Sequence, residues 1–355
     1  MSKLVILGGG YGGLRIIQGL LGASDLPKDL EITLIDRVPY HCMKTEFYAL
    51  AAGTVPDQHI RVPFPTHPQL TFKFGTVEKV ELEENKVILE DGEIVSYDDL
   101  VIALGCEDKY HGVPGADEYT LSIQSVNRAR KTYRTLLALG PDQTVAIVGA
   151  GLSGVELASE LRESRPDLKI ILLDRGEIIL SSYPRRLSEY IQSWFVKNGV
   201  EVVNNANITK VEKNTLYNNG EPIHCDEVVW TAGVQANKVV RDLDIEHDNS
   251  GRAKLTEYHY LKDYENVYVV GDCASLPHPP TAQLAEVQGD QIVSVLLKKW
   301  NNEPLTPLPE IKLKGVLGSL GKKAGFGLMG NTALTGRVPR LLKSGVLWMY
   351  KRHSS

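Results

Sequence analysis

The stretch Leu4-Val5-Ile6-Leu7-Gly8-Gly9-Gly10-Tyr11-Gly12-Gly13 joins an apolar run to a glycine motif of the form G-x-G-x-x-G. A continuous apolar run is typical of a strand that is buried on both faces of a parallel sheet. In this context Gly8 makes the tight turn from strand to helix, Gly10 lets the backbone approach a pyrophosphate, and Gly13 lets the helix pack on the strand. The phosphates would lie at a helix N-terminus, among N–H groups that have no partner in the helix.

An acidic residue follows this motif at the distance that a dinucleotide site requires. The run Glu31–Ile35 is typical of the next strand and ends at Asp36. A carboxylate at that position can bind a ribose hydroxyl.

The same pattern occurs a second time in the chain. Val145–Val148 is followed by Gly149-Ala150-Gly151-Leu152-Ser153-Gly154, and the run Leu168–Leu173 ends at Asp174. One copy alone is compatible with a plain turn. Two copies, each in the strand–turn–helix–strand context, predict two bound dinucleotides with electrons passing between them.

The length of 355 residues predicts two to three domains. We expect an α/β fold with two Rossmann-like dinucleotide-binding domains and a short C-terminal segment. The expected order is a first nucleotide domain split in sequence, a second one inserted in it, and a basic tail. The first nucleotide domain comprises residues 1–108 and 255–310, the inserted second domain comprises residues 109–254, and the basic tail comprises residues 311–355.

Local patterns place further elements between the two motifs and after them. Alternating apolar residues and turn residues predict strands, a hairpin turn at Asp91-Gly92, and a loop over Val55–Pro68. Apolar spacing predicts one long helix near the C-terminus of the second half. The expected strands are 70–74, 77–82, 86–89, 97–105 and 265–272, a meander of short strands follows the second motif to about 233, and the helix is 281–300.

The composition excludes some classes of binding partner and of cellular location. The net charge of −5 argues against nucleic acid, and no apolar run approaches the length of a membrane span. We expect no signal peptide, because the chain starts inside a strand. The four cysteines are scattered without a CxxC or CxxxxC pair, so neither a disulfide framework nor a dithiol redox centre is expected, and a reducing cytoplasm fits. No metal is expected.

The charge is unevenly distributed along the chain. After Glu310 the sequence contains no Asp or Glu, and the segment 337–352 combines basic, aromatic and apolar residues. This composition is typical of a helix that lies on a membrane surface. The alternatives are a helix packed on the protein itself or on a second copy in a homodimer. The cations of this segment are Arg337, Arg340, Lys343, Lys351 and Arg352.

A second acidic turn follows the predicted strand that ends at Gly271-Asp272. A carboxylate at such a strand end can lie over the polyol chain of a nucleotide. Pro279-Pro280-Thr281-Ala282 then begins a helix, and a helix N-terminus can stabilise negative charge on a reduced flavin ring. The alternative is a plain turn with a helix cap.

With these motifs together, the chain resembles the flavoproteins with two dinucleotide-binding domains that are related to glutathione reductase. Within that class it is most similar to type II NADH dehydrogenases, the single-chain NADH:quinone oxidoreductases. The residues that carry the resemblance are Gly8–Gly13, Tyr40–Gly53, Leu100–Gly105, Gly149–Glu156, Val270–Asp272 and Ala282–Ala285.

The resemblance implies a role for each matching residue. It implies that Glu156 lies near the nicotinamide and the flavin, where it orients NADH or relays protons, and that Gln283 binds a quinone carbonyl. The alternative for Glu156 is a favourable carboxylate in the first turn of its helix, and for Gln283 a cap or a solvent contact. FAD would be bound by Gly8, Gly10, Gly13, Asp36, Arg37, Lys44, Thr45, Val77, Gly105, Asp272 and Ala282, and NADH by Gly149, Gly151, Gly154 and Asp174.

The chain departs from the family at the acceptor side. The family pattern AQxAxQ has a second glutamine where this chain has Val287, and Gln288 is its neighbour. One residue along a helix turns the side chain by about 100°. Either Gln288 substitutes poorly, or the acceptor pocket differs. On the donor side, Asp174 favours NADH because a carboxylate repels a 2′-phosphate, and the adjacent Arg175 weakens that preference.

The sequence therefore predicts a flavoenzyme that takes hydride from NADH and passes two electrons to menaquinone or ubiquinone, without proton pumping. It would act in a respiratory chain, in the cytoplasm at the inner face of the cell membrane. One alternative is a soluble reductase of a disulfide, peroxide or ferredoxin, with Cys42 as its thiol. In that class a histidine commonly stands where this chain has Tyr11, so Cys42 is expected to be an apolar filler and His41 a loop contact. Another alternative is a redox sensor with slow turnover.

Overall fold

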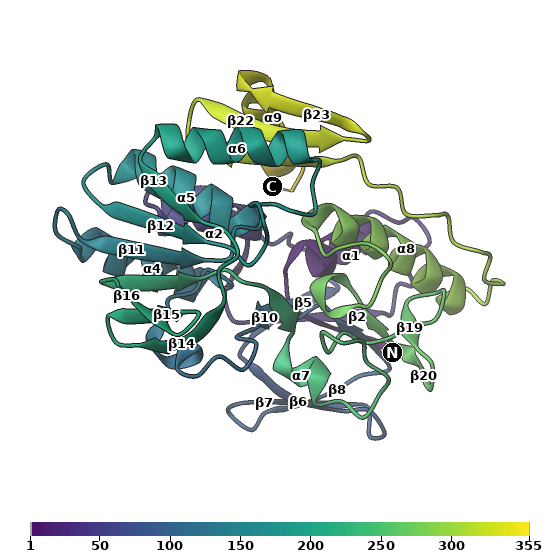
Figure 1. Cartoon of the computed structure of the whole chain (residues 1–355). Coiled ribbons are helices and arrows are strands. Elements are labelled where there is room, and N and C mark those ends of the chain that lie inside the picture. The colour runs from purple at the N-terminus through teal and green to yellow at the C-terminus, as the bar shows by residue number, and fades with distance from the viewer. Residues whose placement is uncertain (1, 355) are drawn as a thin grey trace.

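The computed structural model describes residues 2–354. Its two largest sheets lie side by side (Figure 1), and their strands are parallel except at the β19–β20 edge of the first sheet. The first sheet has the strand order β19-β20-β9-β1-β2-β5, and β1 pairs in parallel with β2 and β9. β20 comes from the far end of the chain and pairs with β9. The bounds are β1 (Lys3–Leu7), β2 (Glu31–Asp36), β5 (Leu70–Phe74), β9 (Asp99–Ile102), β19 (Tyr260–Leu261) and β20 (Tyr264–Val269).

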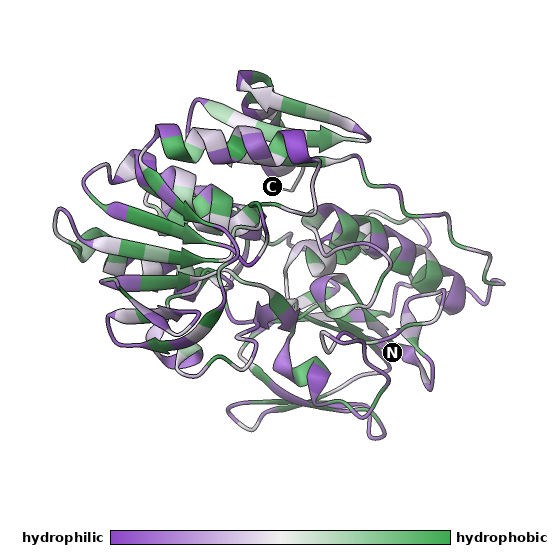
Figure 2. Ribbon diagram, viewed as in Figure 1, coloured by the Kyte–Doolittle hydropathy of each residue, from purple (hydrophilic) through white to green (hydrophobic). Residues whose placement is uncertain are grey.

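The second sheet has the order β13-β12-β11-β17, with all pairs parallel. Its strands are largely green in Figure 2, as expected for strands that helices and loops cover on both faces. The predicted α/β fold with two dinucleotide-binding sheets is confirmed. The bounds are β11 (Thr144–Val148), β12 (Lys169–Leu173), β13 (Val200–Val203) and β17 (Glu227–Trp230).

Two long helices cover one face of the first sheet. α1 (Tyr11–Leu21) follows the first glycine motif, and α8 (Ala282–Trp300) lies against it. A Cβ on Gly19 would lie 2.9 Å from Val293, so glycine permits this close approach. The α8 helix thus ties the end of the chain to its beginning.

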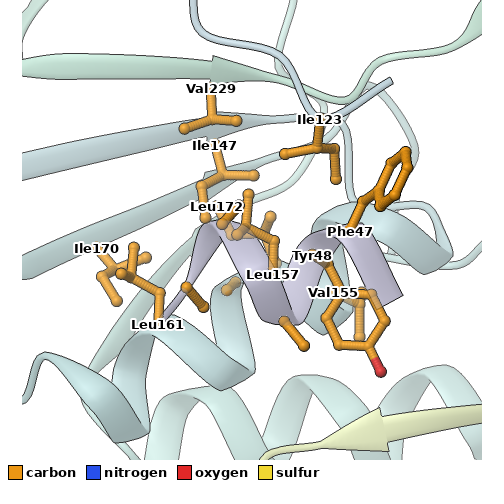
Figure 3. Packing of buried hydrophobic residues seen from close by; sticks show 14 of the residues in the cluster. Phe47, Tyr48, Ile123, Ile147, Val155, Leu157, Leu161, Ile170, Leu172 and Val229 are labelled. Carbon is orange, nitrogen blue, oxygen red and sulfur yellow. The ribbon is translucent and has the colours of Figure 1, made fainter. Parts of the chain in front are cut away.

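The largest apolar core joins the second sheet to a segment from the first half of the chain (Figure 3). Leu157 and Leu161 of α5 (Leu152–Ser164) pack with Ile170 and Leu172, and α2 (Phe47–Ala51) completes the cluster. Tyr48 of α2 contributes its ring, and Figure 3 shows its hydroxyl pointing out of the apolar cluster. The remaining helices are α3 (Ala116–Tyr119), α4 (Val126–Ala138), α6 (Arg185–Lys197) and α7 (Lys238–Arg241).

Short antiparallel strands form the connections. The predicted hairpin at Asp91-Gly92 is present, with Gly92 at φ +85°. The predicted loop Val55–Pro68 is wrong in part, because η2 (Asp57–Ile60) and β4 (Arg61–Pro63) lie inside it and β4 pairs with β3 (Tyr40–Cys42). The other short elements are η1 (Lys44–Glu46), β6 (Val77–Glu81), β7 (Lys86–Leu89), β8 (Ile94–Ser96), β10 (Cys106–Asp108), β14 (Ile208–Glu212), β15 (Thr215–Asn218), β16 (Glu221–His224), β18 (Val234–Ala236) and η3 (Gly271–Cys273).

The C-terminal segment forms a three-stranded antiparallel sheet and a helix, drawn in yellow near α6 in Figure 1. The glycines that obscured these strands in the sequence are needed for their packing. A Cβ on Gly318 would clash with the ring of Phe326, which is fully buried. The bounds are β21 (Val316–Leu320), β22 (Ala324–Met329), β23 (Thr332–Gly336) and α9 (Arg337–Ser354).

Candidate functional site

The two glycine turns have the same backbone geometry. Gly8 and Gly149 both adopt φ +98°, and each N–H donates a 2.8 Å hydrogen bond to the neighbouring strand, at Ile35 and Leu173 respectively. A positive φ of this size favours glycine, because other residues carry a Cβ that clashes with the backbone. The turns therefore end strands β1 and β11 in the same way.

The second and third glycines of the first motif have the same surroundings as their counterparts in the second motif. A Cβ on Gly13 or on Gly154 would clash with the carbonyl oxygen of the first glycine of its own motif. A Cβ on Gly10 or on Gly151 would meet no described atom within 4 Å. Each turn thus has one tightly packed side and one open side, which fits a pyrophosphate beside the helix N-terminus.

The two acidic residues brace these turns. Asp36 accepts hydrogen bonds from the N–H groups of Gly9 (2.6 Å) and Val38 (3.1 Å). Asp174 accepts equivalent bonds from Ala150 (2.7 Å) and Gly176 (2.8 Å).

Burial raises the pKa of Asp36 above its usual value, although the bonds from Gly9 and Val38 oppose that rise. Both carboxylates lie at the C-terminal edge of a second strand, where the ribose of a dinucleotide is bound in this type of fold.

Three segments far apart in the sequence meet at a cluster of Lys44, Cys106 and Asp272, which we call the flavin-side cluster because the sequence predicts flavin contacts for Lys44 and Asp272. The Lys44 ammonium donates to Cys106 Sγ (2.9 Å) and to Asp272 Oδ2 (3.3 Å), and the Cys106 thiol donates to Asp272 (3.0 Å). Burial works to raise the pKa of Asp272, but Lys44 and Cys106 outweigh it and the pKa lies below its usual range. Asp272 is therefore an ionised acceptor at the end of β20.

Gln288 has a structural role beside this cluster. Its side chain is fully buried, with Oε1 accepting from the Gly271 N–H (2.8 Å) and Nε2 donating to Val269 O (3.0 Å). Gly271 adopts φ +78° in the turn that carries Asp272. Gln288 thus holds that turn and does not replace the glutamine that is missing at Val287.

The N-terminus of α8 carries the residues for which the sequence predicts contact with the electron acceptor. Thr281 caps the helix by accepting from the Leu284 N–H (3.0 Å). Gln283 Oε1 accepts from the backbone N–H of Lys314 (3.1 Å). Among residues 2–354, the NH2 group of Gln283 has no acceptor, so it remains available to a ligand.

The other residues predicted to bind FAD lie between residues 37 and 105. Thr45 shares a 2.8 Å hydrogen bond with the Tyr11 hydroxyl, and Arg37 is exposed next to Asp36. Gly105 has φ +71° between β9 and β10, and Val77 is buried at the start of β6.

Glu156 lies under the C-terminal sheet, in the first turns of α5. Its carboxylate accepts from the Ser319 N–H (2.8 Å) and forms an ion pair with Lys343 of α9. Each of the two side chains is at most 10% exposed. The expectation that Lys343 is a membrane-facing cation is wrong, because a buried carboxylate draws its ammonium inward.

A buried ion cluster surrounds this pair and consists of Glu46, Tyr48, Glu156, Ser319 and Lys343. The Lys343 ammonium lies 2.6 Å from the Tyr48 hydroxyl and 3.8 Å from Glu46 Oε1. The Tyr48 hydroxyl lies 3.3 Å from Glu46 Oε1 and 3.1 Å from Ser319 Oγ. The sequence analysis missed Glu46, Tyr48 and Ser319, and only the acidity of Glu46 inside an apolar stretch could have indicated one of them.

The far end of α9 contacts the first glycine turn. Tyr350 Oη lies 3.0 Å from His41 Nε2, and His41 Nδ1 lies 2.8 Å from Gly9 O. A carbonyl oxygen can only accept, so Nδ1 carries the proton and Nε2 accepts from the tyrosine. Burial lowers the pKa of His41 to about 4. His41 thus contacts the first glycine loop at Gly9, as the prediction of a loop contact has it, and it also contacts α9.

Cys42 is partly buried beside His41. Burial raises the pKa of its thiol to about 12, so the thiolate that a thiol mechanism requires is disfavoured. Within the described chain, no three His, Cys, Asp or Glu side chains group as a metal site.

The outer face of α9 is apolar and exposed. Leu341 is 71% exposed and Trp348 is 59% exposed, and Arg352 lies over the Trp348 ring. None of the helices in residues 2–354 has the length and apolar character to cross a membrane. The other exposed apolar residues of the helix are Val338, Leu342, Val346 and Met349.

Comparison with known proteins agrees with this geometry. Residues 2–289 match the model of a family described as pyridine nucleotide-disulphide oxidoreductase. The chain is 61% identical over 355 residues to the NADH dehydrogenase-like protein YutJ of Bacillus subtilis, with all of both chains covered. It is 26% identical to the type II NADH:quinone oxidoreductase of Staphylococcus saprophyticus, over 96% of this chain and 93% of that one. The structure of NDH2 from Plasmodium falciparum in complex with NADH has a TM-score of 0.85 at 18% identity, covering 99% and 96% of the two chains.

Proposed function

Because this chain belongs to the pyridine nucleotide-disulphide oxidoreductase family, we propose that it oxidises NADH through FAD and passes the two electrons to a quinone. The observation that carries the proposal is the pair of matching glycine turns, each braced by a carboxylate and open on one side. Its relatives are NADH dehydrogenase-like oxidoreductases, some of them named for quinone. The proposed reaction is NADH + H⁺ + quinone → NAD⁺ + quinol, without proton pumping.

The two turns would hold different nucleotides. FAD would lie along Gly8–Gly13, with Asp36 toward its adenosine ribose and the flavin-side cluster toward its polyol chain. NADH would lie along Gly149–Gly154 with Asp174 at its ribose, where a carboxylate disfavours a 2′-phosphate. When bound, FAD supplies the ring that takes a hydride and later gives up two electrons. The chain's main contribution is to position the two rings.

The acceptor side is assigned from the helix that begins at Ala282. The free NH2 group of Gln283 would donate a hydrogen bond to a quinone carbonyl. Val287, one turn further, is only partly buried and gives that surface an apolar side chain where the family pattern has glutamine. The Lys343–Glu156 pair would hold and move protons close to the reacting rings, since both groups are buried and in direct contact.

A membrane position is part of the proposal. The exposed apolar face of α9 is flanked by cations, which is the arrangement of a helix that inserts one face into a lipid surface. Each cation near an anionic leaflet adds about 1 kcal/mol. The supporting observation is exposure of Leu341 and Trp348, so we place the enzyme at the inner face of the cell membrane.

Anaerobic reduction and reoxidation test the function. NADH should bleach the flavin of the purified protein, and menadione or a short-chain ubiquinone should restore its colour within seconds. Disulfide, peroxide and ferredoxin serve as competing acceptors. Rapid reoxidation by one of these and by no quinone would refute the proposal, and slow reoxidation by every acceptor would favour a redox sensor.

Sedimentation with vesicles tests the membrane position. The wild-type chain should sediment with vesicles that contain phosphatidylglycerol, and Leu341→Glu should not. If both remain in the supernatant, the membrane position is refuted. If Leu341→Glu dissociates a dimer, the apolar face covers a second copy of the chain.

A further inference from the structure

Glu46 is a buried acid that the reaction described above leaves without a role. It follows Lys44 and Thr45 directly and is 7% exposed, as are Glu156 and Lys343. The buried ion cluster thus contains two carboxylates and one ammonium group. A buried carboxylate without its own counter-charge is costly, so one of the two is favoured to carry a proton.

The contacts decide which carboxylate is protonated. Glu156 touches the Lys343 ammonium directly and accepts the Ser319 N–H. Glu46 lies 3.8 Å from the same ammonium, and its one other polar contact among the described residues is the Tyr48 hydroxyl at 3.3 Å. Glu156 is therefore the better stabilised anion, and Glu46 is the acid.

The charged surroundings support this assignment. Besides Lys343, α9 contributes Arg340, and α5 contributes Glu156 and Glu160. Burial has the largest effect and raises the pKa of Glu46 to about 7, the two acids of α5 raise it further, and the two cations oppose them. Glu46 thus gains and loses its proton in the physiological range, while Tyr48 stays neutral because burial raises its pKa well above the usual value.

We infer that Glu46 stores the one proton that each turnover takes from the solvent and that Tyr48 and Lys343 connect it to Glu156. This inference rests on the proposed function. Two electrons and one hydrogen nucleus come from NADH as hydride, so quinol formation needs one further proton. The O–H bond of Glu46 breaks, a new O–H bond forms on the quinone oxygen after transfer through the cluster, and water reprotonates the carboxylate. Glu46 acts through its neighbours and is a positioning residue for that proton.

The protonation state can be measured without any acceptor. An infrared titration of the oxidised protein should show the band of a protonated carboxylic acid that disappears between pH 6 and 8. Above the midpoint, the protonated fraction that the band reports should fall about tenfold per pH unit. Glu46→Gln should abolish this band, and Glu160→Gln should keep it. A wild-type spectrum without such a band, or a band that survives Glu46→Gln, overturns the inference.

The pH profile of reoxidation gives the second readout. The rate with menadione should fall as pH rises through 7 in the wild-type enzyme, and Glu46→Gln should be slow at pH 6 with a flat profile. Glu160→Gln is the matched control, because Glu160 is a buried acid of the same region that does not contact Lys343 in the described chain. Its profile should still fall with rising pH, with a midpoint moved slightly lower because the charge of Glu160 helps to raise the pKa of Glu46. If Glu46→Gln keeps its flavin and shows an unchanged pH profile, the inference about Glu46 is refuted and the proposed function is not affected. Failure of every quinone refutes the proposed function, and the infrared result still decides the state of Glu46.

Discussion

The two glycine turns are nearly identical in backbone, yet the helices that follow them have different neighbours. α1 packs against the apolar and small residues of α8, where Gly19 meets Val293, and the ion pair Arg15–Asp290 between the two helices is about half exposed. α5 instead directs two carboxylates to the C-terminal segment, where Glu156 accepts from the Ser319 N–H and Glu163 from the Lys322 N–H. Glu160 lies between them in the helix and is buried beside Thr54. The motif fixes where a nucleotide can bind. The neighbours of its helix decide whether charged groups also collect beside it.

The largest effect should come from filling the tight side of each turn. In Gly13→Ala and Gly154→Ala the new methyl group meets the carbonyl oxygen of Gly8 or Gly149, and backbone must move. We expect Gly13→Ala to be purified without flavin. Gly154→Ala should keep its flavin and lose NADH binding at least 100-fold, which flavin absorbance and anaerobic NADH titration measure. Equal flavin content in both variants would show that the two turns are not divided between FAD and NADH.

The next effect concerns the buried ion pair that α9 forms with α5, the helix that follows the second turn. Lys343→Met removes the counter-ion of buried Glu156, and breaking such a pair costs about 3–5 kcal/mol. The control is Lys323→Met, at an exposed lysine in the turn between β21 and β22, and it should change the free energy of unfolding by less than about 0.5 kcal/mol. Urea unfolding measures both. A loss of under about 1 kcal/mol in Lys343→Met would mean that Glu156 takes up a proton in place of its partner.

These two cases also mark what the sequence could predict. The glycine turns, their acids and the parallel sheets follow from local demands on the backbone, so spacing along the chain reveals them. The Lys343–Glu156 pair joins residues 187 positions apart, and Lys343 has the same place in an amphipathic pattern as a solvent-facing cation. The strands β21–β23 were missed because glycines that allow close packing, such as Gly318, resemble a loop in composition.

The first turn should be sensitive to acid and the second should not. Gly9 O accepts from the His41 ring, whereas the equivalent Ala150 O accepts from the backbone N–H of Leu180 (3.1 Å). Burial lowers the pKa of His41 to about 4, below the unfolded value near 6.5, so the unfolded chain binds more protons between these values.

Wild-type stability should therefore fall as pH drops from about 6.5 to 4, by on the order of 3 kcal/mol. His41→Gln should flatten this part of the curve, measured by urea unfolding at each pH. The control is His111→Gln, since His111 is an exposed histidine whose ring contacts the carbonyl oxygen of Ala232 near the second sheet. An equal slope in wild type and His41→Gln would assign the acid sensitivity elsewhere.

The smallest effect should come from the carboxylate that braces the second turn. Asp174→Asn keeps a side-chain oxygen that can accept from the Ala150 N–H. It removes the negative charge, which both repels a 2′-phosphate and strengthens the hydrogen bond to the ribose. We expect kcat/KM for NADH to fall about 10- to 100-fold, which is about 1.4–2.7 kcal/mol, while kcat/KM for NADPH rises, helped by exposed Arg175. Asp36→Asn serves as the comparison, because the same change at the first turn should weaken flavin retention and leave the NADPH/NADH ratio unaltered. A ratio that changes equally in both variants would mean that the two turns do not discriminate between their nucleotides.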